Sequence, residues 1–150
     1  MKHHGHVYHE IYYHLVWGTK ERGPILTSDI EEAIKKYLRM KSHEMEIDLL
    51  AINGIEDHLH IVVKTKPTQC PSEIVRRLKG SSSHYINHEY LPDNSPHSLH
   101  WQQGYGVLSF SKKSLPFVLE YVRNQKDHHK NRTIILTMER MEIMNKSTIY

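Results

Sequence analysis

The chain has 150 residues, of which 38% are hydrophobic, so it can bury one substantial core and we expect a single domain over residues 1–150. The formal net charge is +3, and fourteen histidines add positive charge below neutral pH, a balance that favours a polyanionic partner. The apolar runs are too short for a membrane span or a signal peptide, and Cys70 is the only cysteine. We therefore expect a cytoplasmic protein without disulfides.

The first part of the chain predicts a strand followed by a helix. Residues 11–20, IYYHLVWGTK, are rich in aromatic and β-branched side chains, as strands are. Three large side chains share one face by a period of two: Tyr13, Leu15 and Trp17. Ser28, followed three residues later by Glu31, forms a capping box for a helix that runs to about Met45.

A hairpin is expected next. Residues 47–53, IDLLAIN, read as a second strand, and residues 58–64, HLHIVVK, as a third. Asn53-Gly54 is a frequent turn pair, so we expect the turn to begin there and the two strands to be antiparallel.

The second half repeats the alternation of helix and strand. A second helix begins near Pro71, which suits a first helical turn, and Gly80 is expected to loosen it. Residues 101–111, WQQGYGVLSFS, predict a fourth strand despite two glycines. Ser114 or a neighbour caps a last helix over residues 115–130.

This order of elements indicates an α+β, ferredoxin-like (split βαβ) sandwich. It is βαββαβ with an extra C-terminal helix, and the four strands form one antiparallel sheet. The two crossover helices pack on one face of the sheet. We expect the other face to be free for ligands or a partner.

The third strand carries the first candidate site. Side chains alternate along a strand, so His58 and His60 point to one face while Leu59, Ile61 and Val63 point into the core. Two imidazoles at this spacing can bind one divalent metal and leave positions for other ligands. With fourteen histidines in the chain, however, one such pair arises by chance, and the pair alone is weak evidence.

The last helix supplies possible partners for the histidine pair. Its expected buried stripe consists of apolar residues: Leu115, Val118, Leu119 and Val122. Tyr121 and Gln125 are neighbours one turn apart on another side. The Gln125 amide oxygen can complete a His, His, Gln metal site, with the Tyr121 phenol beside it. The alternative is a half-buried tyrosine and a solvated glutamine without a shared role.

Five blocks in this order resemble the HUH single-tyrosine transposases of bacterial insertion sequences, the TnpA-like enzymes: YHLVWGTKER, DHLHIVV, IVRRLKGSSS, GYGVLSFS and YVRNQKDHHK. HUH denotes two histidines that flank a bulky hydrophobic residue, as in His58 to His60. The resemblance implies that these histidines bind the metal, that Tyr121 is the nucleophile, and that Gln125 is the third ligand. His128 or His129 is the alternative third ligand.

The resemblance also implies the reaction. Such an enzyme cleaves and rejoins single-stranded DNA at the ends of an insertion sequence through a 5′-phosphotyrosine intermediate, with Mg²⁺ or Mn²⁺ at the histidine pair. Its substrate is a DNA hairpin near the element's end. The resemblance implies a homodimer, in which each tyrosine acts at the histidine pair of its own chain or, as the resemblance favours, at that of the partner.

Basic residues indicate where DNA binds. Arg76, Arg77 and Lys79 precede a hydroxyl-rich GSSS segment that can hold phosphates. Lys112 and Lys113, at the start of the last helix, are expected to extend the same surface. The alternative is that these residues are ordinary solvated charges.

Two other functions compete with the transposase. A host-adapted relative acting on dispersed palindromic repeats would share the active site. A non-catalytic, ferredoxin-like nucleic-acid-binding module would use aromatic side chains of the sheet to stack bases, and its histidines would be incidental.

Overall fold

The computed structural model of the chain describes residues 6–141. Its strands are β1 (Ile11–Gly18), β2 (Asp48–Ile55), β3 (His58–Thr65) and β4 (Gly106–Phe110). Its α-helices are α1 (Ser28–Glu44), α2 (Pro71–Tyr85), α3 (Leu115–Arg123), α4 (Gln125–Asn131) and α5 (Leu136–Glu139). Within residues 6–141, no helix is both long and apolar enough to cross a bilayer.

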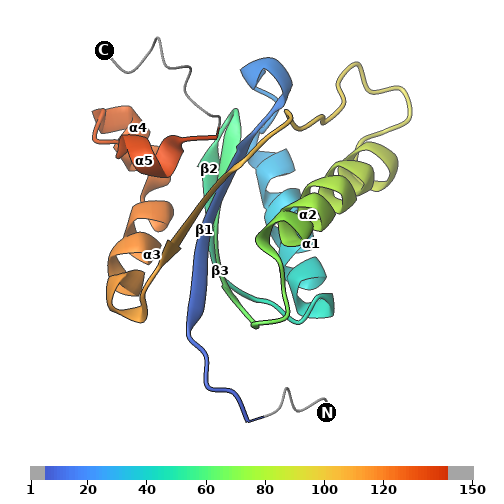
Figure 1. The fold of residues 1–150 in the computed structure, drawn as a ribbon. Coiled ribbons are helices and arrows are strands. Elements are labelled where there is room, and N and C mark those ends of the chain that lie inside the picture. The colour runs from blue at the N-terminus through green and yellow to red at the C-terminus, as the bar shows by residue number, and fades with distance from the viewer. Residues whose placement is uncertain (1–5, 142–150) are drawn as a thin grey trace.

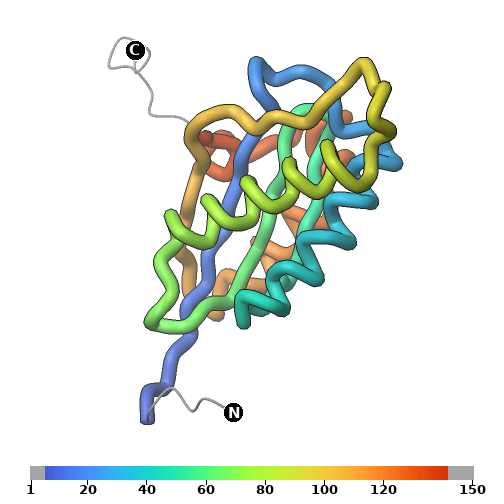
Figure 2. Tube along the Cα trace, turned by 90° about the vertical axis from the view of Figure 1, so that its right-hand side faces the viewer, coloured from blue at the N-terminus to red at the C-terminus, as the bar shows by residue number. Residues whose placement is uncertain are grey.

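The four strands form one antiparallel sheet in the order β2-β3-β1-β4, which confirms the predicted ferredoxin-like arrangement. Helices α1 and α2 cover one face of this sheet (Figure 1). Figure 2 shows that they lie side by side across it.

The main core lies between the sheet and these two helices. Leu59, Ile61 and Val63 of β3 point into it, together with Leu15 and Trp17 of β1. The period of two in both strands therefore predicts the buried face correctly. His58 and His60 point to the opposite face of β3.

The opposite face of the sheet is not free, contrary to expectation, because α3, α4 and α5 cover it (Figure 1). A second apolar cluster joins α3 and α5 to β2 and β3, and its buried members are Ala51, Val62, Val118, Tyr121, Val122 and Met138. Leu115 and Leu119 are only partly buried at its edge, so the expected stripe is rotated toward Tyr121. The rotation follows from packing on the sheet, which turns Tyr121 inward.

The N-cap residue of α1 lies one position earlier than predicted. Thr27, not Ser28, is the N-cap residue, and its hydroxyl accepts a hydrogen bond of 3.4 Å from the Ile30 backbone N–H. Glu31 does not reach back to the cap. It is buried and pairs with Lys35 and Lys126 instead.

The predicted turn at Asn53-Gly54 is wrong, because both residues belong to β2 and pair with His60 and Leu59 of β3. The hairpin turns at residues 56–57. Gly54 has a steric role instead: a Cβ at this position would lie 2.1 Å from the backbone oxygen of His58. The two strands of the hairpin can approach this closely only with glycine here.

Four other details differ from the prediction. Helix α2 is continuous through Gly80. Strand β4 starts only at Gly106, and Trp101 makes an isolated bridge with Thr19 outside the strand. No side chain caps α3 at Ser114. The last helix is divided at Asn124 into α3 and α4.

Replacing Gly54 with alanine should destabilise the fold by about 1–3 kcal/mol, because the added methyl group overlaps the backbone of the strand that carries the histidines. The matched control is Gly80→Ala, where no atom lies within 4 Å of the added Cβ. This substitution should stabilise α2 by about 0.5–1 kcal/mol. Urea unfolding of both variants measures the difference, and equal stabilities would contradict the packing described for the hairpin.

Candidate active site

The histidine pair lies beneath the C-terminal helices and is almost completely buried. His58 and His60 are 1% and 0% exposed, respectively, on the sheet face that α3 and α4 cover. Their Nε2 atoms approach Glu139 of α5, and their Nδ1 atoms contact other residues of the chain.

Tyr121 of α3 reaches the same place within one chain. Its ring centroid lies 6.1 Å from that of His60, and its side chain is 2% exposed. Its hydroxyl donates a hydrogen bond of 3.0 Å to Glu139 Oε1 and accepts one of 3.0 Å from the Ile135 backbone N–H. The half-buried tyrosine considered from sequence is therefore not what the structure contains.

Gln125 is also buried, rather than solvated, at the start of α4. Its Oε1 lies 3.3 Å from His58 Nε2 and 2.9 Å from His129 Nε2. His128 points elsewhere: its ring stacks on Tyr121 with centroids 4.6 Å apart. Of the two histidines considered as alternative third ligands, His129 is the one that joins the cluster.

Glu139 completes a compact set of donor atoms. His58, His60, His129 and Glu139 each offer one ligand atom, and these atoms lie within 4.8 Å of one another. Glu139 Oε2 lies 2.6 Å from His60 Nε2, and Oε1 lies 3.0 Å from His129 Nε2. This His/Glu cluster could hold a metal ion.

The contact between His60 and Glu139 favours a cation. Despite their separation of 2.6 Å, His60 Nε2 and Glu139 Oε2 have no hydrogen-bond partner of proper geometry within residues 6–141. Both atoms are buried, and a buried polar atom without a partner is costly. Imidazole nitrogens with a carboxylate and an amide oxygen form a donor set that suits a divalent metal, so the residues fit such an ion.

Burial and neighbouring groups shift the pKa values of the cluster in different directions. Burial would lower the pKa of His58, but Glu139 and Asp57 outweigh it and raise that pKa. Burial lowers the pKa of His60 below its ordinary value, so its imidazole is neutral at neutral pH. Burial would raise the pKa of Glu139, but the imidazoles of His58 and His60 outweigh it and hold that pKa well below the usual range. An anionic carboxylate therefore faces a neutral imidazole across the cluster.

A polar network anchors α4 beside the histidines. Lys126 Nζ donates to Glu31 Oε1 and to Asn53 Oδ1, each at 2.7 Å, and so joins α4 to α1 and β2. The Asn53 side-chain amide donates a hydrogen bond of 2.9 Å to the backbone oxygen of Arg123, where α3 ends. These contacts position Gln125, which lies between Arg123 and Lys126 in the sequence.

The basic residues predicted to bind DNA do not share one surface. Arg76 and Arg77 are exposed on α2, and Arg76 pairs with Glu73. Lys79 donates hydrogen bonds to the backbone oxygens of Gln102 and Gly104. These bonds attach α2 to the segment that precedes β4.

Lys112 and Lys113 are exposed and directly precede α3, a helix that lies on the other side of the sheet from α2 (Figure 1). Lys112 lies 3.6 Å from Glu10. The sheet therefore separates this pair from the basic residues of α2.

Sequence reasoning missed three residues of the site. His14 was detectable, because it alternates with Tyr13 and Leu15 on the first strand and must face the same side as the histidine pair. Asp57, whose Oδ1 lies 2.7 Å from His58 Nδ1, directly precedes that pair. Glu139 has no such signal, since it lies in a short helix after an irregular segment.

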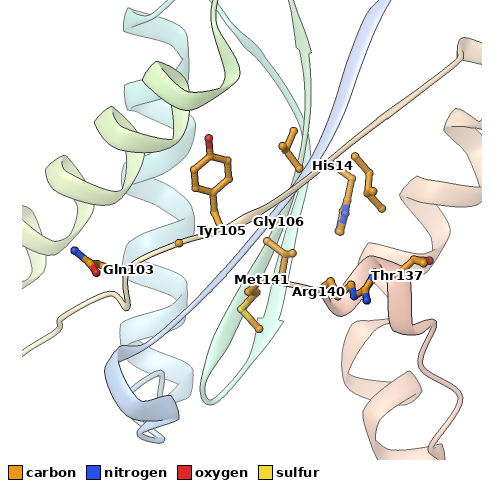
Figure 3. Close-up of a pocket in the computed structure, with 11 residues that line it drawn as sticks. His14, Gln103, Tyr105, Gly106, Thr137, Arg140 and Met141 are labelled. Atoms are coloured by element: carbon orange, nitrogen blue, oxygen red, sulfur yellow. The ribbon is translucent and has the colours of Figure 1, made fainter. Parts of the chain in front are cut away.

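A pocket of about 670 Å³ opens beside the cluster, between β4 and residues 137–141. Figure 3 shows His14, Tyr105, Gly106 and Arg140 among the residues that line it. His14 thus separates this pocket from His60, which its ring contacts on the other side.

The chain is similar to known proteins in sequence and in fold. The chain is 25% identical over 125 residues to the ISDra2 transposase TnpA of Deinococcus radiodurans, a match that covers 82% of this chain and 89% of the relative. A crystal structure of a protein described as a transposase, also from Deinococcus radiodurans, is 28% identical, with a TM-score of 0.65 over 83% of this chain and 97% of that one.

A REP-associated tyrosine transposase bound to a REP hairpin shares the fold at 14% identity. Its TM-score is 0.58 over 89% of this chain and 76% of that one. The family model described as "Transposase IS200 like" matches residues 7–125. The chain therefore belongs to the IS200-like transposase family.

Proposed function

We propose that this transposase cleaves and rejoins single-stranded DNA with Tyr121 as the nucleophile, beside a divalent cation held by His58 and His60. The observation that carries the proposal is that Tyr121, the histidine pair and Gln125, which are distant in sequence, meet in one buried cluster. The family match supports DNA transposition as the general activity. The geometry of the cluster supports these residues as the ones that carry out the reaction.

The reaction is a transesterification. The Tyr121 phenol oxygen attacks the scissile phosphorus and loses its proton, the bond from phosphorus to the 3′ oxygen breaks, and that oxygen leaves as a 3′ hydroxyl. The 5′ phosphate stays linked to tyrosine. A second 3′ hydroxyl later attacks this link and releases the phenol, so the strands rejoin without an external energy source.

The cation would be held by His58, His60 and Gln125, with Glu139 and His129 as further donors in the same cluster. When bound, Mg²⁺ or Mn²⁺ supplies positive charge for the phosphate oxygens. The remaining work belongs to the chain itself, which must place the phenol and admit the DNA.

The phenol needs help to react. Burial raises the pKa of Tyr121 to about 12, so the side chain is neutral at neutral pH. Glu139 Oε1 accepts the phenol hydrogen bond and so orients the phenol oxygen, whose proton passes in the reaction to the departing 3′ oxygen. Because only 2% of Tyr121 is exposed, a DNA phosphate can reach it only after residues 135–139 move.

The proposed partner is a DNA hairpin near the end of a mobile element. The exposed side chains of Arg77 and Lys113, with Arg76 and Lys112, are proposed to contact phosphates from the two sides of the sheet. Lys79 contributes mainly by holding the segment before β4. Two ends must be cut, so we propose a homodimer, which provides two tyrosines.

The histidine cluster argues against a purely binding module, because incidental histidines need not converge with a tyrosine and a carboxylate. A role on palindromic repeats is the second candidate function. The observation that favours it is the likeness in fold to a transposase bound to a REP hairpin. Both functions use the same active site and differ in the hairpin they bind.

Tyr121→Phe should abolish the covalent protein-DNA adduct and leave hairpin binding intact, because it removes one oxygen and little packing. The measurement is incubation with a labelled single-stranded hairpin and Mn²⁺, followed by denaturing electrophoresis. Tyr85→Phe is the control, since Tyr85 stacks on Tyr37 across the sheet from the site. An adduct that persists in Tyr121→Phe would reject the nucleophile.

His58→Ala and His60→Ala should each weaken Mn²⁺ binding by more than about tenfold, as measured by titration calorimetry without DNA. Gln125→Ala should have a smaller effect, because Glu139 and His129 remain in the cluster. His84→Ala, on the exposed surface of α2, is the control. Unchanged affinity in both histidine variants would show that the metal binds elsewhere.

The raised pKa of Tyr121 predicts a pH dependence of stability. The unfolded phenol ionises near pH 10 and the folded one near 12, so stability present below pH 10 is lost as pH rises to 12. Between pH 8 and 11, wild type should lose roughly 1 kcal/mol more than Tyr121→Phe in urea unfolding. Tyr12, whose hydrogen bond to Glu10 raises its pKa to about 12, contributes equally to both proteins. Identical losses would contradict the burial of the Tyr121 hydroxyl.

A further inference from the structure

Each histidine of the pair is held from behind at its Nδ1 atom. His58 Nδ1 lies 2.7 Å from Asp57 Oδ1, and His60 Nδ1 lies 2.8 Å from His14 Nε2. The Nε2 atoms of both rings face Glu139. Both rings therefore direct Nε2 toward Glu139, although their planes are inclined by 65°, and a carboxylate contacts Nδ1 of one ring while an imidazole contacts Nδ1 of the other.

His14 is an unusual residue for its position on β1. Its side chain is 1% exposed, and its Nδ1 has no hydrogen-bond partner within residues 6–141. Leaving a buried polar atom unpartnered costs about 1–3 kcal/mol, and an aliphatic side chain would avoid that cost. The polar contact that His14 does make is the one to His60, with the ring centroids 5.0 Å apart and the planes inclined by 30°.

The tautomer of His60 follows from this contact when a cation is present. A neutral imidazole carries one hydrogen, and the nitrogen that binds a metal must offer its lone pair. If Nε2 of His60 faces the cation, the hydrogen is on Nδ1 and needs an acceptor. The nearest one is Nε2 of His14.

We propose that His14 is a positioning residue for the metal centre: it accepts the Nδ1 hydrogen of His60 and so keeps Nε2 of His60 directed at the cation. It does for His60 what Asp57 does for His58. The proposal rests on the metal site of the proposed function and adds a residue that does not itself touch metal or DNA.

Two substitutions at position 14 separate this role from packing. His14→Phe keeps an aromatic ring but removes the acceptor, whereas His14→Gln keeps an oxygen that can accept at about the place of Nε2. In calorimetric titration without DNA, His14→Phe should bind Mn²⁺ about 10–100-fold more weakly than wild type. His14→Gln should recover most of the loss, and His84→Phe, on the exposed surface of α2, should show none.

A spectroscopic measurement on the wild-type chain covers the case in which a variant fails to fold. With Mg²⁺ bound, imidazole ¹⁵N shifts should show His60 with its hydrogen on Nδ1, whereas a hydrogen on Nε2 would overturn the proposal. Wild-type Mn²⁺ affinity in folded His14→Phe would overturn it too. A wild-type chain that binds no Mn²⁺ would overturn the metal centre itself, and His14's role with it.

Discussion

The alternation of side chains along β3 is the constraint on which the rest of the structure depends. Leu59, Ile61 and Val63 enter the core under α1 and α2, and the intervening His58 and His60 must then face the other side. One strand thus supplies both the centre of the core and the centre of the site. A shift of register by one residue would bury the imidazoles in the apolar core and place the aliphatic residues among the polar groups under α3 to α5.

Burying the histidines on the second face requires that other residues of the chain satisfy them. Helices α3 and α5 cover that face through the apolar cluster around Val62 and Val122, and Lys126 attaches α4 beside them. The polar groups beneath are then held by Asp57, His14, Gln125 and Glu139, without which their desolvation would be costly. Two buried atoms of this cluster that lack a hydrogen-bond partner within residues 6–141, His60 Nε2 and Glu139 Oε2, are ones that a cation would satisfy.

Much of the fold and the centre of the site could be predicted from sequence, because both follow from local periodicity. The order of strands and helices and the face of each residue in β1 and β3 needed only a period of two or 3.6. The turn predicted at Asn53-Gly54 was wrong because this residue pair is frequent in turns, whereas here the glycine is required by the close approach of the His58 backbone. A close contact between two strands cannot be predicted from the sequence of one strand alone.

The residues that remained hidden depend on tertiary packing. Glu139 enters the site because the chain returns over the sheet after α4, and no pattern in its own segment indicates that path. The burial of Tyr121 depends in the same way on how α3 packs on β2 and β3. The free face expected from the ferredoxin-like order was wrong because the fold class does not determine where an added C-terminal helix packs.

The central claim is that Tyr121 becomes covalently joined to DNA. Its most direct test is mass spectrometry of tryptic peptides after incubation with a single-stranded hairpin and Mn²⁺. The peptide of residues 114–123 contains Tyr121 as its one tyrosine, and it should carry a 5′-linked nucleotide. A nucleotide on any other peptide, or cleaved DNA with no modified peptide, would contradict the claim.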